Sequence, residues 1–315
     1  MRTYFSALTL SLLGMLASCG GGGNGSQGVA QYFQSAVFQA AQIQSHGNIE
    51  FSQRPNAAGA QYTSDARKAS ELGTGTLTLL MDVWVPPNAT SVTPMPLVVF
   101  VHGGGFNSGG KEDRTADALS YASSGFVTAS VNYRLTPNNT DSPELRQTAI
   151  VEAADDVMNA IRFLKKNAAT YHIDTTRVAI VGTSAGGALG LIDAVQADEL
   201  TGTSNDYTGY SAKVNAVVST GATLIDDQFD SSGLLHFDAS DAPVLMFHAD
   251  PTDGTTGATW DGNVVPTCDS FNNAGDSCTK VPTPNGGHTV PIDLSSKWWA
   301  MIQPFLWNEL LLANL

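Results

Sequence analysis

The residues around Ser184 have the types and spacing needed to present a serine hydroxyl as a nucleophile. An apolar run at Val178–Val181 leads into Gly182-Thr183-Ser184-Ala185-Gly186-Gly187, and a helix-compatible stretch follows. A Gly-x-Ser-x-Gly motif between a strand and a helix is typical of a sharp turn that exposes the serine side chain. Glycines suit this turn because the strained serine backbone crowds its neighbours. We therefore expect Ser184 to attack an acyl carbon.

A second glycine-rich segment predicts donors for the negative charge that this attack would create. The apolar run Leu97–Val101 is followed by His102-Gly103-Gly104-Gly105-Phe106. Backbone N–H groups of a preformed loop stabilise an oxyanion without reorganising. We expect the donors to be the amides of Gly104, Gly105 and Ala185. For His102 we expect a structural role, in which its side chain bonds the loop backbone.

His288 is the histidine whose position best suits a general base. It follows Asn285-Gly286-Gly287, late in the chain, on a glycine-flanked loop before the last expected helix. An imidazole on such a loop could take the serine proton. The other histidines outside the glycine loop precede the main domain, lie in connecting segments or end a strand: His46, His172, His236 and His248.

Three motifs together resemble the bacterial carboxylesterase branch of the α/β-hydrolases, which includes acetyl-xylan and feruloyl esterase-like enzymes. They are HGGGF, the later Asn132-Tyr133-Arg134-Leu135, and GTSAGG. The resemblance covers the chain from about residue 73 to its end. It implies that serine, acid and histidine follow one another in this order, with His288 as the base. Such a mechanism needs no cofactor and no metal.

The acid of this triad is expected in the loop after the strand Val244–Phe247. The family pattern His-Gly-x-x-Asp occurs here as His248-Ala249-Asp250-Pro251-Thr252-Asp253, with alanine in place of glycine and the spacing changed by one residue. Asp253 is our first choice because it lies deeper in the loop. Asp250, whose Asp-Pro pair resembles that of related esterases, and Asp261 remain alternatives. The acid would hold the imidazole in the correct tautomer.

The elements that must position these residues indicate an α/β protein with a mostly parallel central sheet and helices on both faces. We expect residues 73–315 to form this catalytic domain, and residues 29–72 to add a short helix and loops. A helix is expected at Val151–Lys166, whose apolar residues recur at helical spacing, and another at Ser295–Leu312. The expected strands are Thr76–Val85, Leu97–Val101, Val127–Asn132, Val178–Val181, Val214–Ser219 and Val244–Phe247.

The N-terminal 28 residues have the composition of an export signal and a tether. Residues 1–19 carry Arg2 and then an apolar run too short to span a bilayer, as in a signal peptide. The ending Leu16-Ala17-Ser18-Cys19 resembles a bacterial lipobox, in which Cys19 would be lipidated. Residues 20–28 are glycine-rich and would form a flexible tether. We expect a lipid-anchored, extracytoplasmic protein, held at the outer membrane or cell surface of a bacterium.

The two other cysteines and the net charge restrict the ligands and partners. Cys268 and Cys278 lie ten residues apart and could form a disulfide in an oxidising compartment, whereas their spacing does not match a zinc site. The 315-residue chain has a net charge of −14, which disfavours nucleic acid as a partner. We therefore expect a small-molecule or polymer ester as the substrate, and a membrane contact through the lipid anchor alone.

Three functions remain open from the sequence. The first is hydrolysis of short- to medium-chain acyl esters, for which Phe106, Phe229, Leu234 and Leu235 are candidate pocket residues. The second is another serine acyl hydrolase: a polyester hydrolase, a lipase or a peptidase. A peptidase usually has an extra gating domain and a lipase a long apolar lid, and the chain shows neither pattern. The third is a non-catalytic surface-binding lipoprotein, a class that usually lacks the serine or the glycines.

Overall fold

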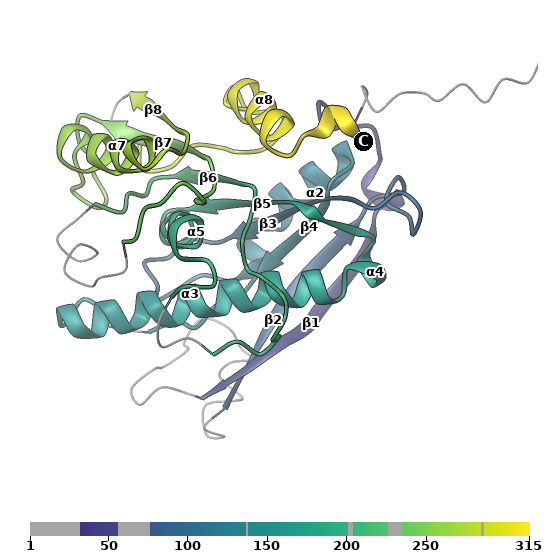
Figure 1. Ribbon diagram of the computed structural model, residues 1–315, viewed down its shortest axis with the longest axis horizontal. Coiled ribbons are helices and arrows are strands. Elements are labelled where there is room, and N and C mark those ends of the chain that lie inside the picture. The colour runs from purple at the N-terminus through teal and green to yellow at the C-terminus, as the bar shows by residue number, and fades with distance from the viewer. Residues whose placement is uncertain (1–31, 56–75, 137, 201–203, 226–234, 285–286) are drawn as a thin grey trace, which may run out of the picture.

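An eight-stranded sheet runs through the computed structural model, which describes residues 32–55, 76–136, 138–200, 204–225, 235–284 and 287–315 (Figure 1). The strand order is β1-β2-β4-β3-β5-β6-β7-β8, and the six strands from β4 to β8 in this order are parallel to one another. β1 and β2 add an antiparallel edge. The strands are β1 (Gln44–Pro55), β2 (Thr76–Val85), β3 (Met95–Val101), β4 (Val127–Val131), β5 (Ile173–Thr183), β6 (Ala216–Thr220), β7 (Val244–Asp250) and β8 (Cys278–Pro284). The expected mostly parallel sheet is confirmed.

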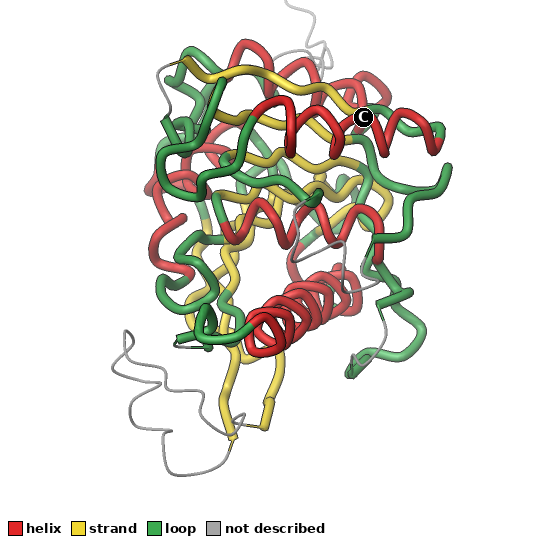
Figure 2. The backbone as a smooth tube through the Cα atoms, turned by 90° about the vertical axis from the view of Figure 1, so that its left-hand side faces the viewer, coloured by secondary structure: helices red, strands yellow, loops and turns green. Residues whose placement is uncertain are grey.

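Helices cover both faces of this sheet, which explains why its central strands are buried on both sides. Every residue of β3, β4 and β6 is buried. On one face, α3 (Pro143–Lys166) packs against α5 (Ala185–Gln196), and α5 contacts β5 and β6. On the other face lie α2 (Thr115–Ser124) and α8 (Trp299–Glu309) (Figures 1 and 2). Tyr121 and Trp299 form an edge-to-face contact between these two helices.

The bounds of two helices differ from those expected. α3 begins at Pro143, eight residues before the apolar repeat that predicts it, because the Ser142 hydroxyl accepts a hydrogen bond from the Leu145 amide and caps the helix. α8 is shorter than the expected 295–312. Two further short helices are α4 (Ala168–Tyr171) and α7 (Val265–Ala274).

The expectation of a short helix and loops between residues 29 and 72 is wrong for residues 44–55. This segment is β1, which pairs with β2 over most of its length and belongs to the same sheet as the rest of the domain. The strand was missed because an edge strand with polar, mostly exposed positions has little apolar periodicity. Near the end of β1, Arg54 is 4% exposed and forms ion pairs with Asp155, Asp156 and Asp206.

β8 was also not expected, for a related reason. Its sequence, CTKVPTP, contains two prolines, which remove ladder donors and are tolerated at a sheet edge. The expected signal peptide, Cys19 and the tether lie outside the described residues, as do Phe229 and Leu234. Among the helices that the structure describes, none is both long and apolar enough to cross a membrane.

Candidate active site

Ser184 lies at the tight turn between β5 and α5. Its backbone angles are φ 54° and ψ −122°, a strained conformation for a residue with a side chain, and its N–H donates to the Thr220 carbonyl at 2.8 Å. A Cβ atom at Gly182 would lie 2.1 Å from the Gly186 oxygen, and one at Gly186 would lie 2.2 Å from the Val101 oxygen. The turn therefore requires glycine at both positions, as its motif predicts.

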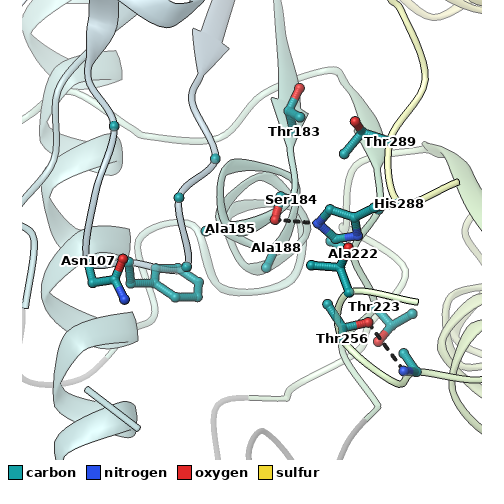
Figure 3. A pocket seen from close by; sticks show the side chains of 18 of the residues that line it. Asn107, Thr183, Ser184, Ala185, Ala188, Ala222, Thr223, Thr256, His288 and Thr289 are labelled. Atoms are coloured by element: carbon teal, nitrogen blue, oxygen red, sulfur yellow. Dashed lines mark hydrogen bonds between the residues drawn. The ribbon is translucent and has the colours of Figure 1, made fainter. Parts of the chain in front are cut away.

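The structure brings Ser184, His288 and Asp253 together from three separate segments. The Nε2 atom of His288 lies 2.7 Å from Ser184 Oγ (Figure 3). Its Nδ1 atom lies 2.6 Å from Asp253 Oδ2. The His288 loop is held against the end of β6, where the Val290 amide donates to Thr220 Oγ1 at 2.8 Å. This chain of hydrogen bonds has the geometry by which a carboxylate orients an imidazole toward a serine hydroxyl.

Of the three candidate acids, Asp253 is the one beside His288. Its side chain is buried, and its Oδ1 accepts the amides of Thr255 at 2.8 Å and Thr256 at 3.3 Å. Burial raises the pKa of Asp253, but the bonds from His288 and from these amides outweigh it and leave the pKa below its usual value. The carboxylate is thus ionised at neutral pH. Asp250 and Asp261 are exposed.

His248 lies closer to this acid than its position in the sequence suggested. It is buried at the end of β7, with Nε2 3.7 Å from Asp253 Oδ2 and Nδ1 3.1 Å from the Ala249 oxygen. Burial lowers its pKa, so the ring is neutral at pH 7. Two histidines therefore face one carboxylate oxygen. The His-x-x-x-x-Asp spacing was the signal that could have indicated this contact.

The glycine loop after β3 lies against the serine turn. A Cβ atom at Gly103 would approach the Thr183 oxygen to 2.9 Å and Ser184 Cβ to 3.1 Å, so the two segments touch. Gly104 and Gly105 have φ values of +113° and +60°. Ala185 is the first residue of α5, where an amide has no acceptor within the helix. The loop and the N-terminus of α5 thus both lie next to the serine.

His102 contacts the backbone of this loop and the ring of Tyr133. Its buried ring stacks on Tyr133 with 4.2 Å between centroids, and its Nδ1 lies 2.7 Å from the Gly103 oxygen. The Tyr133 hydroxyl donates to the carbonyls of His102 and Gly103 at 3.0 and 3.2 Å. These contacts are of the structural kind expected for His102.

A cavity of about 1250 Å³ opens in front of Ser184. Figure 3 shows Ser184 between the segment of Asn107 on one side and Ala222 and Thr223 on the other. Small and polar residues predominate in its walls, and Phe106 is among them, whereas Leu235 is not. In the described part of the chain, one group of side chains could hold a metal ion, the surface residues Glu199, His236 and Asp238, and it does not line this cavity.

The expected disulfide between Cys268 and Cys278 is confirmed. It joins α7 to the first residue of β8. Both elements lie between the Asp253 loop and His288 in the sequence, so the bond closes a local loop within the segment that connects them.

Comparisons with known proteins agree with this fold. The BD-FAE family model matches residues 81–227. Carboxylesterase NlhH of Mycobacterium tuberculosis is 32% identical over 109 residues, which are 34% of this chain and 31% of that protein. Ethyl acetate hydrolase of Pseudomonas putida is 31% identical over 120 residues, 38% of this chain and 35% of that protein. The match thus spans about a third of each of these two relatives.

Solved structures resemble a larger part of the chain. The structure of a truncated carbohydrate esterase from gut microbiota aligns with 84% of this chain along 100% of its own length, with a TM-score of 0.60 and 18% identity. The propionate-bound esterase of Thermogutta terrifontis aligns with 74% of this chain along 86% of its own length, with a TM-score of 0.56 and 20% identity. These likenesses show the α/β-hydrolase fold.

Proposed function

We propose that this chain, a member of the α/β-hydrolases, is a serine carboxylic-ester hydrolase acting on short- to medium-chain acyl esters. The observation that carries the proposal is the hydrogen-bonded series Ser184–His288–Asp253 at the wall of a cavity. The similarity to a carboxylesterase and to an ethyl acetate hydrolase supports the choice of an ester as substrate. The small residues Ala185, Ala188 and Ala222 around the serine suit a compact acyl group.

The geometry supports a two-step acyl transfer. His288 Nε2 takes the Ser184 proton while Oγ attacks the ester carbonyl carbon, and the carbonyl oxygen becomes an oxyanion held by the amides of Gly104, Gly105 and Ala185. The tetrahedral intermediate collapses, and His288 gives the proton to the departing alkoxide. Water, deprotonated by His288, then attacks the acyl-serine and releases the acid, and the proton returns to Ser184. Asp253 stabilises the imidazolium in both steps.

The experiment is hydrolysis of p-nitrophenyl esters from acetate to palmitate by the wild-type chain and by Ser184→Ala. We expect activity that is greatest on short chains and falls by at least about 10⁴-fold in the variant. A fluorophosphonate probe should label the wild-type serine and leave the variant unlabelled. Equal activity in both proteins, or no activity and no labelling of the wild type, would contradict the proposal.

We also propose that the protein works outside the cytoplasm, anchored through a lipid on Cys19. The disulfide between Cys268 and Cys278 supports an oxidising compartment, where such bonds persist. Metabolic labelling with a fatty acid in a bacterial host should mark the wild-type chain at the outer membrane and should not mark Cys19→Ser. Labelling of both chains would contradict the anchor.

A further inference from the structure

We propose that Asn139 and Arg146 are positioning residues of the oxyanion hole, which they hold in shape through the Gly105 carbonyl and the Phe106 ring. The inference rests on the proposed function, because it assigns a role to residues next to that site. Neither residue belongs to a motif that indicates chemistry. Asn139 lies in the loop after β4, and Arg146 lies in the first turns of α3, far from the glycine loop in sequence.

The loop needs support because its backbone is strained. Gly104, Gly105 and Phe106 are three consecutive residues with positive φ, of +113°, +60° and +63°. Glycine accepts such angles freely, whereas Phe106 carries a side chain and pays for its conformation in free energy. Such a residue keeps its backbone conformation when the surrounding structure over-determines it.

Two side chains converge on the carbonyl that precedes Phe106. Asn139 Nδ2 and Arg146 Nη1 each donate to the Gly105 oxygen at 2.9 Å. The pair is itself joined, since Arg146 Nη1 donates to Asn139 Oδ1 at 2.8 Å, and Asn139 is fully buried. The Arg146 guanidinium also lies over the Phe106 ring, 4.6 Å from its centroid. One arginine thus restrains both the backbone and the side chain at this corner of the cavity.

This restraint acts on the peptide that directly follows the proposed donors, because the Gly105 carbonyl shares its planar peptide with the Phe106 amide. A trans peptide directs its N–H opposite to its C=O, so a carbonyl that is held outward directs the amide of the next residue the other way. The Gly103 oxygen is held by His102 and Tyr133, and the Gly104 oxygen accepts the amides of Asn107 and Ser108 at 3.0 and 3.1 Å. The Asn139–Arg146 pair fixes the third carbonyl, and with it the angles that connect Gly105 to Phe106.

The test compares Arg146→Gln, Arg146→Lys and Asn139→Ala with the wild-type chain, on p-nitrophenyl acetate. We expect kcat to fall about 10- to 100-fold in Arg146→Gln and Asn139→Ala, with KM within about twofold, because a displaced oxyanion loop weakens binding of the transition state alone. Arg146→Lys can donate to one oxygen and should recover part of kcat. Arg177→Gln is the matched control: Arg177 is partly buried and paired with Asp174, outside the cavity, and its loss should leave kcat unchanged.

Hydrogen exchange of the peptide that contains residues 103–108 gives a second readout, independent of activity. We expect faster exchange in this peptide in Arg146→Gln and Asn139→Ala, and unchanged exchange in the strands of the sheet. Unchanged loop exchange, unchanged kcat, or a higher KM with unchanged kcat would overturn the proposal; the last result would mean a direct contact with substrate. If the wild type hydrolyses no ester, the proposed function fails, and loop exchange still decides whether the pair holds the loop.

Discussion

Asp253 and Asp250 lie three residues apart in the sequence, but Asp253 is buried and Asp250 is exposed. Asp253 accepts three hydrogen bonds, from His288 and from two amides of its own loop, whereas Asp250 ends β7 with an exposed side chain. A carboxylate that orients an imidazole must be buried and fixed, since a solvated one would move with its loop. The two residues therefore allow a matched comparison.

We predict that Asp253→Asn lowers kcat/KM by about 10³- to 10⁴-fold, because an amide facing His288 Nδ1 favours the wrong tautomer of the ring. Asp250→Asn should stay within about twofold of the wild type, as a surface change does. Steady-state hydrolysis of p-nitrophenyl acetate measures both. A larger loss for Asp250→Asn than for Asp253→Asn would assign the acid to Asp250.

At the scale of elements, α5 joins the nucleophile to the core of the domain. All twelve of its residues are buried, among them Asp193, which is 1% exposed. Neither carboxyl oxygen of Asp193 has a hydrogen-bond partner in the described part of the chain. Burial raises the pKa of Asp193 to about 8, against the opposing attraction of Lys165 and Arg162. The helix therefore carries a neutral carboxylic acid at pH 7.

We predict that Asp193→Asn stabilises the protein at pH 8. The unfolded chain releases the Asp193 proton near pH 4, and the folded chain keeps it up to about pH 8. The unfolded state thus binds fewer protons in this range, so the free energy of unfolding falls as pH rises through it. A pKa difference of about four units makes this loss about 5 kcal/mol at pH 8. Asparagine removes the loss but buries an amide without a partner, which costs about 1–3 kcal/mol, so the net gain should be about 2–4 kcal/mol.

Urea unfolding at pH 5 and pH 8 measures this effect, with the exposed Asp261→Asn as control. The difference between the two pH values should shrink in Asp193→Asn and remain in Asp261→Asn. A variant that keeps the full wild-type pH dependence would show that Asp193 is ionised in the folded chain.

The disulfide makes a separate prediction about the elements α7 and β8. It closes a short loop, and its removal should lower the free energy of unfolding by about 2–3 kcal/mol. Replacing Cys268 and Cys278 together by alanine should lower Tm, and a reductant should lower Tm of the wild type without affecting the variant. Equal Tm values for wild type and variant would show that the packing of α7 and β8 suffices.

At the scale of the whole molecule, a buried group of charges ties the N-terminal strand to the central helices. Arg54 from β1 and Arg134, which follows β4, both bind Asp155 and Asp156 of α3. Arg54 also pairs with Asp206 at 2.9 Å. Removing one partner of a buried ion pair leaves an uncompensated charge, which destabilises far more than loss of a surface pair. β1 therefore contributes to the stability of the whole domain.

We predict that a chain starting at residue 73 is less stable than a chain starting at residue 32 by at least about 3–5 kcal/mol, because it lacks Arg54 and the edge strand. The chain from residue 32 keeps both and should match the 315-residue chain in stability. Urea unfolding followed by circular dichroism measures the difference. Equal stability of the two shortened chains would mean that the sheet does not need β1.

The parts of this protein that depend on local chemistry can be predicted from the sequence alone. The serine turn, the parallel apolar strands, the helices α3 and α8 and the pairing of Cys268 with Cys278 all follow from short patterns of glycine, apolar residues or cysteine. The choice between Asp253 and Asp250 required the folded structure, since burial and distance to His288 depend on how a loop closes over the sheet. It also revealed β1, β8 and the Asn139–Arg146 pair, because edge strands and buried polar contacts join residues distant in sequence and leave no periodic signal.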